Sequence, residues 1–158
     1  MASIPLTKNG VERIEKELRR LKTVERPDVI NAIAEARAQG DLSENAEYDA
    51  ARERQGFVEG RIQELEATLA NAQVIDPSTL DAGGRVVFGA TVNIEDLESG
   101  ENVSYQIVGD LEADIKENRI SVSSPVARAL IGKEVGDIIE VQAPAGVREY
   151  EIIEINYA

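Results

Sequence analysis

The sequence predicts a two-domain α+β protein, in which an antiparallel α-helical coiled-coil hairpin precedes a small antiparallel β-sheet domain with one short helix. Three observations support this. Apolar residues recur every three or four positions through most of residues 1–75, as in helices. A Gly-Asp turn at residues 40–41 divides that region into two halves. From residue 85 onward, short alternating runs lie between turn residues, as in strands. We therefore predict a hairpin over 1–75, a linker over 76–84 and a globular domain over 85–158.

The composition excludes several kinds of site. The 158 residues include no Cys and no His, so disulfides, thiolate zinc sites and imidazole general bases are absent. Any metal must be held by carboxylates, which suit hard cations such as magnesium. The net charge of −13 disfavours binding of free nucleic acid through a broad basic face. No apolar run is long enough for a membrane span or resembles a signal segment, so a cytoplasmic protein without a membrane partner is expected.

The two halves differ in charge. Residues 1–75 contain 11 basic and 14 acidic residues, whereas residues 76–158 contain 6 and 16. Most of the arginines thus belong to the helical half, where a local basic patch can form.

The first helical pattern follows an extended lead-in over residues 4–10, with Thr7 as the predicted helix cap. Pro27 interrupts the pattern and predicts a kink, because its ring removes a backbone hydrogen bond. The apolar positions of this pattern are Val11, Ile14, Leu18, Leu21, Val29, Ile30, Ile33 and Ala34.

The second helical pattern alternates spacings of three and four over more than three heptads, which is typical of a coiled-coil seam. Its members are Tyr48, Ala51, Gln55, Val58, Ile62, Leu65, Leu69 and Ala72. Folded back on the first pattern, these roughly 30 residues form an arm about 45 Å long. Such an arm is suited to reaching into another molecule and offers no enclosed pocket.

An acidic turn joins the two patterns. Gly40 is suited to end the first helix in a left-handed conformation. Asp41 is the predicted cap of the second helix, starting at Ser43 or Glu44, and Glu44 stands at the capping-box spacing. On spacing alone, the two carboxylates either cap the helix or are delivered by the arm to another site.

The second domain begins after Pro77, which ends the helical pattern. One short helix is predicted, capped by Ser124, opened by Pro125 and closed by Gly132. The predicted strands span residues 85–94, 103–108, 119–122, 138–141 and 148–155.

Several stretches together resemble the bacterial Gre transcript cleavage factors over essentially the whole chain. The most specific is Gly40-Asp41-Leu42-Ser43-Glu44-Asn45-Ala46-Glu47-Tyr48. The others are Ile4-Pro5-Leu6-Thr7, the Glu17–Lys22 helix, Arg26-Pro27, Ala32–Gln39, Gln55-Gly56-Phe57-Val58-Glu59-Gly60-Arg61-Ile62 and Ser124–Gly132.

This resemblance implies a function. The C-terminal domain, with a fold similar to FK506-binding proteins, would dock on the rim of the RNA polymerase secondary channel. The coiled coil would enter the channel and stimulate the polymerase's own cleavage of backtracked RNA, so the chain itself is not an enzyme. The expected partners are RNA polymerase and the nascent RNA 3′ end in the elongation complex, with DNA contacted only indirectly. A monomer without a cofactor of its own is expected.

The resemblance also implies roles for individual residues. Asp41 and Glu44 align with the acids that help to hold the second magnesium ion, Mg²⁺ being shared with the polymerase active site. Arg37 and Arg52 belong to a basic patch facing the RNA, although a solvated helix face would also explain them. Ser124, Pro125 and Arg128 are expected in polymerase docking. The remaining tip residues have structural interpretations: Tyr48 in the core, Arg54 on the surface, and Asn45, Glu47 and Asp49 on the helix face or shaping the tip.

Three alternatives stay open. A Gre-like protein that occupies the channel can inhibit polymerase, but such homologues have altered acidic tips. A peptidyl-prolyl isomerase or chaperone would need converging aromatic residues, and this domain has only Phe88, Tyr105, Tyr150 and Tyr157. A plain coiled-coil adaptor would not need an acidic turn.

Overall fold

The computed structural model describes residues 3–40, 45–79 and 82–157 and shows two units. One is helical and spans Val11–Ala72, whereas the other combines Ser3–Gly10 with Gln73–Ala158. These units divide the chain differently from the predicted boundaries in two respects. The N-terminal lead-in belongs with the C-terminal unit, because β1 (Ile4–Thr7) pairs with β2 (Ala72–Ile75) in a two-stranded sheet. The predicted linker is also part of that unit, in which Pro77 is buried.

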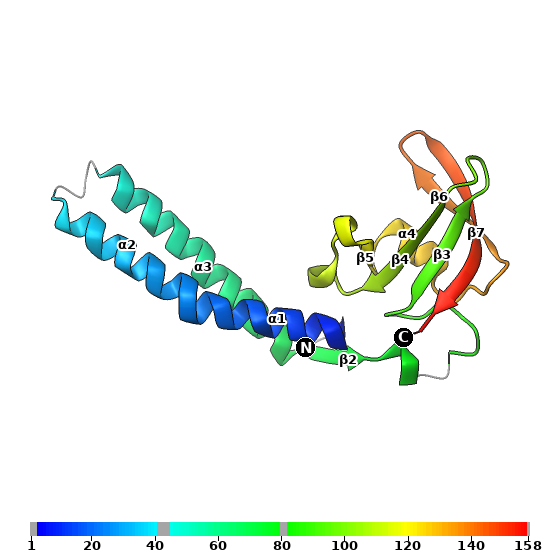
Figure 1. Cartoon of the computed structure of the whole chain (residues 1–158), viewed down its shortest axis with the longest axis horizontal. Helices are drawn as coiled ribbons and strands as arrows, with labels where there is room; N and C mark the ends of the chain where they lie inside the picture. Colours follow the sequence, from blue (N-terminus) through cyan, green and yellow to red (C-terminus); the bar gives the residue numbers. More distant parts are fainter. Residues whose placement is uncertain (1–2, 41–44, 80–81, 158) are drawn as a thin grey trace. The chain divides into compact units, whose positions relative to one another are not determined.

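The helical unit is the predicted hairpin. The first side of the hairpin consists of α1 (Lys8–Arg20), a π-helical segment η1 (Leu21–Glu25) and α2 (Arg26–Ala38). The second side is α3 (Ala46–Ala70), which runs antiparallel beside the first (Figure 1). The residues that bury the seam are Ile14, Val29, Ile33, Ala36, Ala51, Val58, Ile62 and Leu65. Gln55 and Tyr48 are half-buried on the same seam.

The π-helical segment changes the phase of the seam. Ile14, Leu18 and Leu21 follow steps of four and three, and the same steps would next place Glu25, Asp28, Ala32 and Glu35 on the seam. The buried residues lie one position later, at Val29, Ile33 and Ala36. A π turn inserts one extra residue, so this segment moves three carboxylates out of the apolar seam. For the same reason, the prediction of Ile30 and Ala34 as seam residues was wrong, and both are exposed.

The predicted interruption at Pro27 takes the form of this π turn. The Arg26 N–H donates to the carbonyl oxygen of Leu21, five residues back. Pro27 then stands at the start of α2, a position that tolerates the missing N–H of proline. Arg20, Glu25 and Arg26 keep right-handed helical dihedral angles, so the backbone remains helical there.

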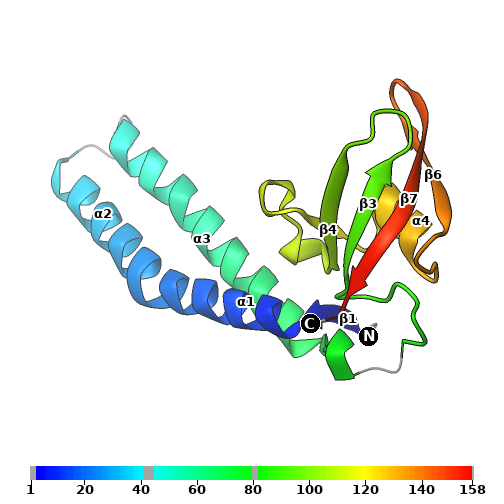
Figure 2. The same cartoon turned by 45° about the vertical axis from the view of Figure 1, so that its right-hand side comes forward.

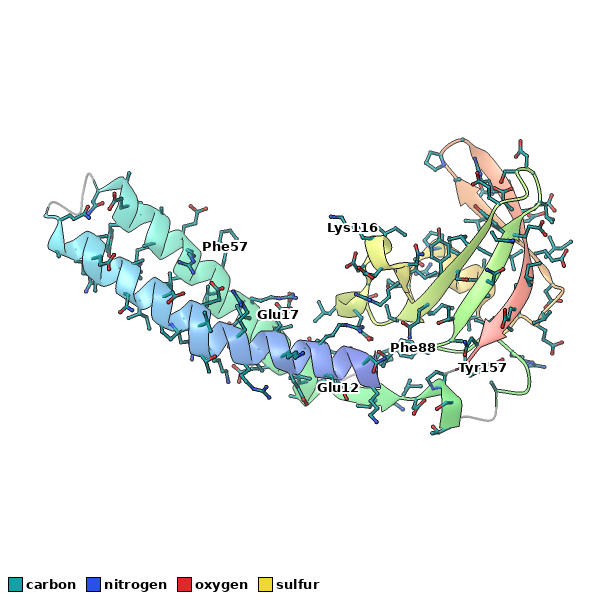
Figure 3. The ribbon with its side chains drawn as sticks, viewed as in Figure 1. Glu12, Glu17, Phe57, Phe88, Lys116 and Tyr157 are labelled. Atoms are coloured by element: carbon teal, nitrogen blue, oxygen red, sulfur yellow. The ribbon has the colours of Figure 1, made fainter. Side chains whose placement is uncertain are left out.

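Charged pairs link the two sides of the hairpin. The Arg26 guanidinium donates to both Glu59 oxygens at 2.9 and 2.8 Å, and Arg61 donates to both Glu17 oxygens at 2.6 and 3.0 Å. Figure 3 shows Glu17 on α1. The bond from Arg26 lowers the pKa of the Glu59 carboxyl. These pairs are partly exposed and are therefore weakened by solvent screening, so their main effect is to match the faces of the two helices.

The C-terminal unit contains a five-stranded sheet in the order β5-β4-β3-β7-β6. Figure 2 labels four of its strands, β4, β3, β7 and β6. The strands are β3 (Thr91–Asp96), β4 (Asn102–Val108), β5 (Arg119–Ser121), β6 (Ile138–Ala143) and β7 (Gly146–Asn156). The all-antiparallel prediction was wrong at one edge, where β5 pairs parallel to β4. The reason is the connection between them: two 3₁₀ turns, Asp110–Glu112 and Ile115–Glu117, bring the chain back in the same direction. The strand predicted from residue 85 begins only at Thr91.

The short helix α4 (Pro125–Leu130) packs on this sheet as predicted. Ser124 caps it by accepting the Ala127 N–H at 3.3 Å, Pro125 stands in its first turn, and Gly132 follows it with a φ of 84°. The buried core of the unit is aliphatic, with Val86, Val92, Ile94, Ile107, Ile120, Ala127, Leu130, Ile139, Val141 and Ile152.

A buried carboxylate joins the N-terminal lead-in to the rest of this unit. Glu112 accepts hydrogen bonds from the Thr7 N–H at 3.1 Å, the Thr7 hydroxyl and the Gly109 N–H at 2.9 Å. Thr7 in turn accepts the Gly10 N–H at 3.0 Å and so caps α1, as predicted. The root of the first helix is thus attached to a residue 105 positions away.

Asp96 is expected to make the stability of the C-terminal unit sensitive to acid. Its carboxylate accepts from the Glu98 and Ser99 N–H groups and from Arg148, which lower its pKa. Because its folded pKa is the lower one, its contribution is complete above the unfolded pKa of about 3.9 and is lost as pH falls through the folded pKa. Urea unfolding from pH 7 to pH 2 should therefore show a shallower acid loss for Asp96→Asn than for the wild type. Glu98→Gln, an exposed carboxylate in the same turn, is the control, and an equal loss in wild type and Asp96→Asn would contradict the prediction.

Candidate functional site

The end of α2 has the predicted geometry. Gln39 donates its N–H to the Ala36 carbonyl at 3.2 Å, and Gly40 donates to the Arg37 carbonyl at 3.3 Å. Gly40 has a φ of 113°, a conformation that strains residues with a Cβ. The glycine is therefore required where the chain leaves the helix.

The acidic pair predicted from the sequence, Asp41 and Glu44, lies outside the described residues. The start of α3 is described and differs from the prediction. The helix begins at Ala46, and its cap is Asn45, whose side-chain oxygen accepts the Tyr48 N–H at 3.0 Å. The prediction of Asp41 as the cap, with a helix start at Ser43 or Glu44, was therefore wrong. Asn is as good a helix cap as Asp. The prediction chose Asp41 because of its capping-box spacing and so passed over Asn45, which directly precedes the helix.

Asn45 also contacts the opposite helix. Its side-chain N–H donates to the Ala36 carbonyl in the last turn of α2 at 2.6 Å. One half-buried side chain thus bonds to both stems of the turn.

Arg37 and Arg52, from opposite helices, line one open groove of about 450 Å³. The other lining residues are Ile30, Ile33, Ala34 and Gln55. Both arginines are exposed, and neither makes an ion pair or side-chain hydrogen bond with another described residue. Arg54 is exposed, as predicted, and its guanidinium donates to Glu25 at 2.8 Å and lowers the pKa of that carboxyl. The groove thus presents two guanidinium groups available to a phosphate-bearing ligand.

An exposed aromatic residue on the hairpin was not singled out from the sequence. Phe57 projects from α3 away from α1 and α2 (Figure 3), and its side chain is 72% exposed. Its position outside the three-four spacing of the second seam was the available signal. It adds nothing to the hairpin core.

The residues predicted for docking belong to the second unit. Ser124 is half-buried as the α4 cap, whereas Pro125 and Arg128 are exposed. Asp110 orders the approach to this helix by accepting from the Ser121 and Ser123 hydroxyls, which lower the pKa of its carboxyl. Pro125 and Arg128 therefore lie directly after a segment that is held by hydrogen bonds to Asp110.

The described ranges 3–40, 45–79 and 82–157 contain no group of three or more acidic side chains placed to hold a metal ion. Carboxylate oxygens are the donor type that magnesium prefers, so the types of Asp41 and Glu44 fit that ion, but two carboxylates leave most of its ligands to other molecules. Over the same ranges, no helix has both the length and the apolar character to cross a bilayer.

Comparison with known proteins identifies the family. Residues 4–74 match the family described as "Transcription elongation factor, N-terminal", and residues 81–157 match "Transcription elongation factor, GreA/GreB, C-term". The chain belongs to the GreA/GreB family of transcription elongation factors. This confirms the resemblance to the Gre factors.

The curated relatives of this Gre factor are similar over its full length. It is 67% identical to the transcription elongation factor GreA of Verminephrobacter eiseniae and 66% identical to that of Ralstonia nicotianae, in each case over 99% of both chains. The few basic residues near the tip and the acidic overall balance also favour the GreA type. Among solved structures, GreA factor homolog 1 of Thermus thermophilus is 30% identical, with 98% of this chain and 99% of that chain covered and a TM-score of 0.44.

Proposed function

We propose that this Gre-family factor binds RNA polymerase through its secondary channel and stimulates the polymerase's own cleavage of backtracked RNA. Release of the 3′ fragment would allow an arrested complex to resume elongation. The observation that supports this most is a helical hairpin whose two stems are joined by an acidic segment in a chain of the GreA/GreB family. A two-helix arm is suited to enter such a channel.

The chain does not act as a hydrolase alone in this proposal. It contains no His or Cys, and the groove near its tip is open. Asp41 and Glu44 would supply two carboxylates to a metal centre whose remaining ligands come from polymerase and RNA. A second magnesium ion held there would stabilise the attacking or leaving oxygen during hydrolysis. The factor therefore contributes half of a site.

The C-terminal unit would provide the docking surface, through Ser124, Pro125 and Arg128. A fold similar to FK506-binding proteins remains a prediction, as do the monomeric state and the cytoplasmic location, where polymerase would be met. Isomerase activity is not favoured, because three of the four aromatic residues of this domain have other contacts. Tyr105 and Tyr150 pack against the aliphatic core, and the Tyr157 hydroxyl donates to the Arg85 carbonyl.

The decisive experiment uses stalled elongation complexes with labelled RNA 3′ ends. Addition of the factor should release short 3′ fragments and restore elongation by the remaining RNA. Slower elongation without fragments would instead indicate a channel-binding inhibitor. Turnover of a proline-containing test peptide would indicate an isomerase.

Arg37→Ala and Arg52→Ala should each weaken contact with the RNA 3′ segment. A phosphate contact is charge-assisted, so we expect roughly a fivefold to tenfold loss of stimulated cleavage at limiting factor. The measurement is crosslinking from a photoreactive RNA 3′ end, together with the cleavage rate.

Arg54→Ala is the matched control, because it removes the same charge from α3 but a guanidinium already bound to Glu25. It should retain the crosslink. An undiminished crosslink to Arg37→Ala and Arg52→Ala would argue against the patch.

A further inference from the structure

We infer that Asn45 is a positioning residue for the acidic turn. Its amide clamps the first turn of α3 to the last turn of α2, and so sets the spacing of the stems that present Asp41 and Glu44. This inference rests on the proposed function, in which those two carboxylates reach the polymerase metal centre.

The two ends of the amide have different partners. The oxygen of Asn45 accepts the Tyr48 N–H at 3.0 Å, within its own helix. The nitrogen donates to the Ala36 carbonyl at 2.6 Å, on the opposite helix. Aspartate could replace the first bond, because it also caps helices, but a carboxylate has no N–H for the second. Of these two side chains, only the amide supplies both an acceptor and an N–H donor.

The acceptor on α2, the Ala36 carbonyl, lies in the last turn of the helix, where carbonyls need hydrogen-bond donors from outside the regular helix pattern. Carbonyls in the last turn of a helix lack the usual N–H donor four residues on. Gly40, four residues after Ala36, donates instead to Arg37, leaving Ala36 with the Gln39 N–H and the Asn45 amide. Ala36 is 2% exposed and Asn45 is half-buried, so water competes weakly for this bond.

The clamp lies at the ends of the segment that contains the proposed functional carboxylates. Gly40 is bonded to Arg37 and Asn45 to Ala36, which holds the residues on both sides of positions 41–44. Holding both ends of a short segment reduces the number of conformations that it can adopt. Positioning matters strongly for catalysis, because a misplacement by about 1 Å can cost roughly 100-fold in rate.

The test compares Asn45→Asp and Asn45→Ser with the wild type. Both variants keep a capping oxygen, and neither keeps the amide donor. We expect the cleavage rate at saturating factor to fall about tenfold or more, with the half-saturating factor concentration within about twofold and a higher magnesium requirement. The split between maximal rate and binding separates positioning from general loss of folding.

Asn71 offers a matched control at the other end of α3. Its side-chain amide donates to the Ala67 carbonyl at 2.8 Å, a bond within the same helix. Asn71→Asp and Asn71→Ser should retain the wild-type maximal rate and magnesium dependence.

A second readout needs no polymerase. The chain has no native Cys, so Ala38→Cys and Glu47→Cys allow spin labels to be placed on each stem. Continuous-wave electron paramagnetic resonance should show a broader interspin distance distribution when Asn45→Asp or Asn45→Ser is added. An unchanged distribution, or a wild-type maximal rate in both variants, would overturn the clamp. Failure of the wild type to release RNA fragments would instead refute the proposed function.

Discussion

Asp41→Asn and Glu44→Gln are each expected to abolish stimulated RNA cleavage while polymerase binding stays within about twofold of wild type. An amide keeps the size of the side chain but loses the negative charge that makes a carboxylate a magnesium ligand. Metal stabilisation of the reacting oxygens is worth several kcal/mol, so a loss of roughly 100-fold or more is expected. The measurements are cleavage of backtracked RNA and competition for polymerase with a labelled wild-type factor.

This test separates loss of the carboxylates from loss of the helix cap, because the cap of α3 is Asn45. Neither substitution removes the residue that starts the helix. Glu47→Gln and Asp49→Asn are matched controls, since they neutralise exposed carboxylates in the first turn of α3. Normal cleavage by both tip variants would refute their role in the metal centre.

Glu112→Ala is expected to lower the free energy of unfolding of the C-terminal unit by roughly 3 kcal/mol. The substitution leaves two buried N–H groups, of Thr7 and Gly109, without their acceptor, and each such group costs about 1–3 kcal/mol. Urea unfolding followed by near-ultraviolet circular dichroism of the tyrosines measures this. Glu117→Ala, an exposed carboxylate five residues on, should stay within about 0.5 kcal/mol of wild type.

Gly10→Ala tests the same contact from the other side. A Cβ at Gly10 would lie 1.8 Å from a Glu112 carboxylate oxygen, so the substitution should displace Glu112 and destabilise the wild-type protein. In the Glu112→Ala background that clash is absent. Gly10→Ala should then stabilise by about 0.5–1 kcal/mol, as expected for Ala replacing Gly within a helix. The same sign in both backgrounds would contradict the assigned contact.

Local patterns were sufficient for most of the elements. The hairpin, the Thr7 and Ser124 caps, Gly40 at the end of α2 and four of the five strands all followed from the sequence. Each depends on residues within one or two turns or on simple periodicity, so the information is contiguous in the chain. The motif around the acidic turn was likewise specific enough to indicate the family.

The tertiary structure decided the rest. Which side chain caps α3 depends on the carbonyl of Ala36, which approaches Asn45 only when the two helices are paired. The π segment at Leu21–Glu25 shifts the apolar positions by one residue, because this places apolar residues of α2 against α3. The attachment of Thr7 to Glu112 joins residues 105 positions apart, and no short pattern reports such a contact. The sequence by itself thus determined an acidic turn between two helices, whereas packing between distant segments decided how Asn45 is bonded at the start of α3 and how Thr7 is bonded to Glu112.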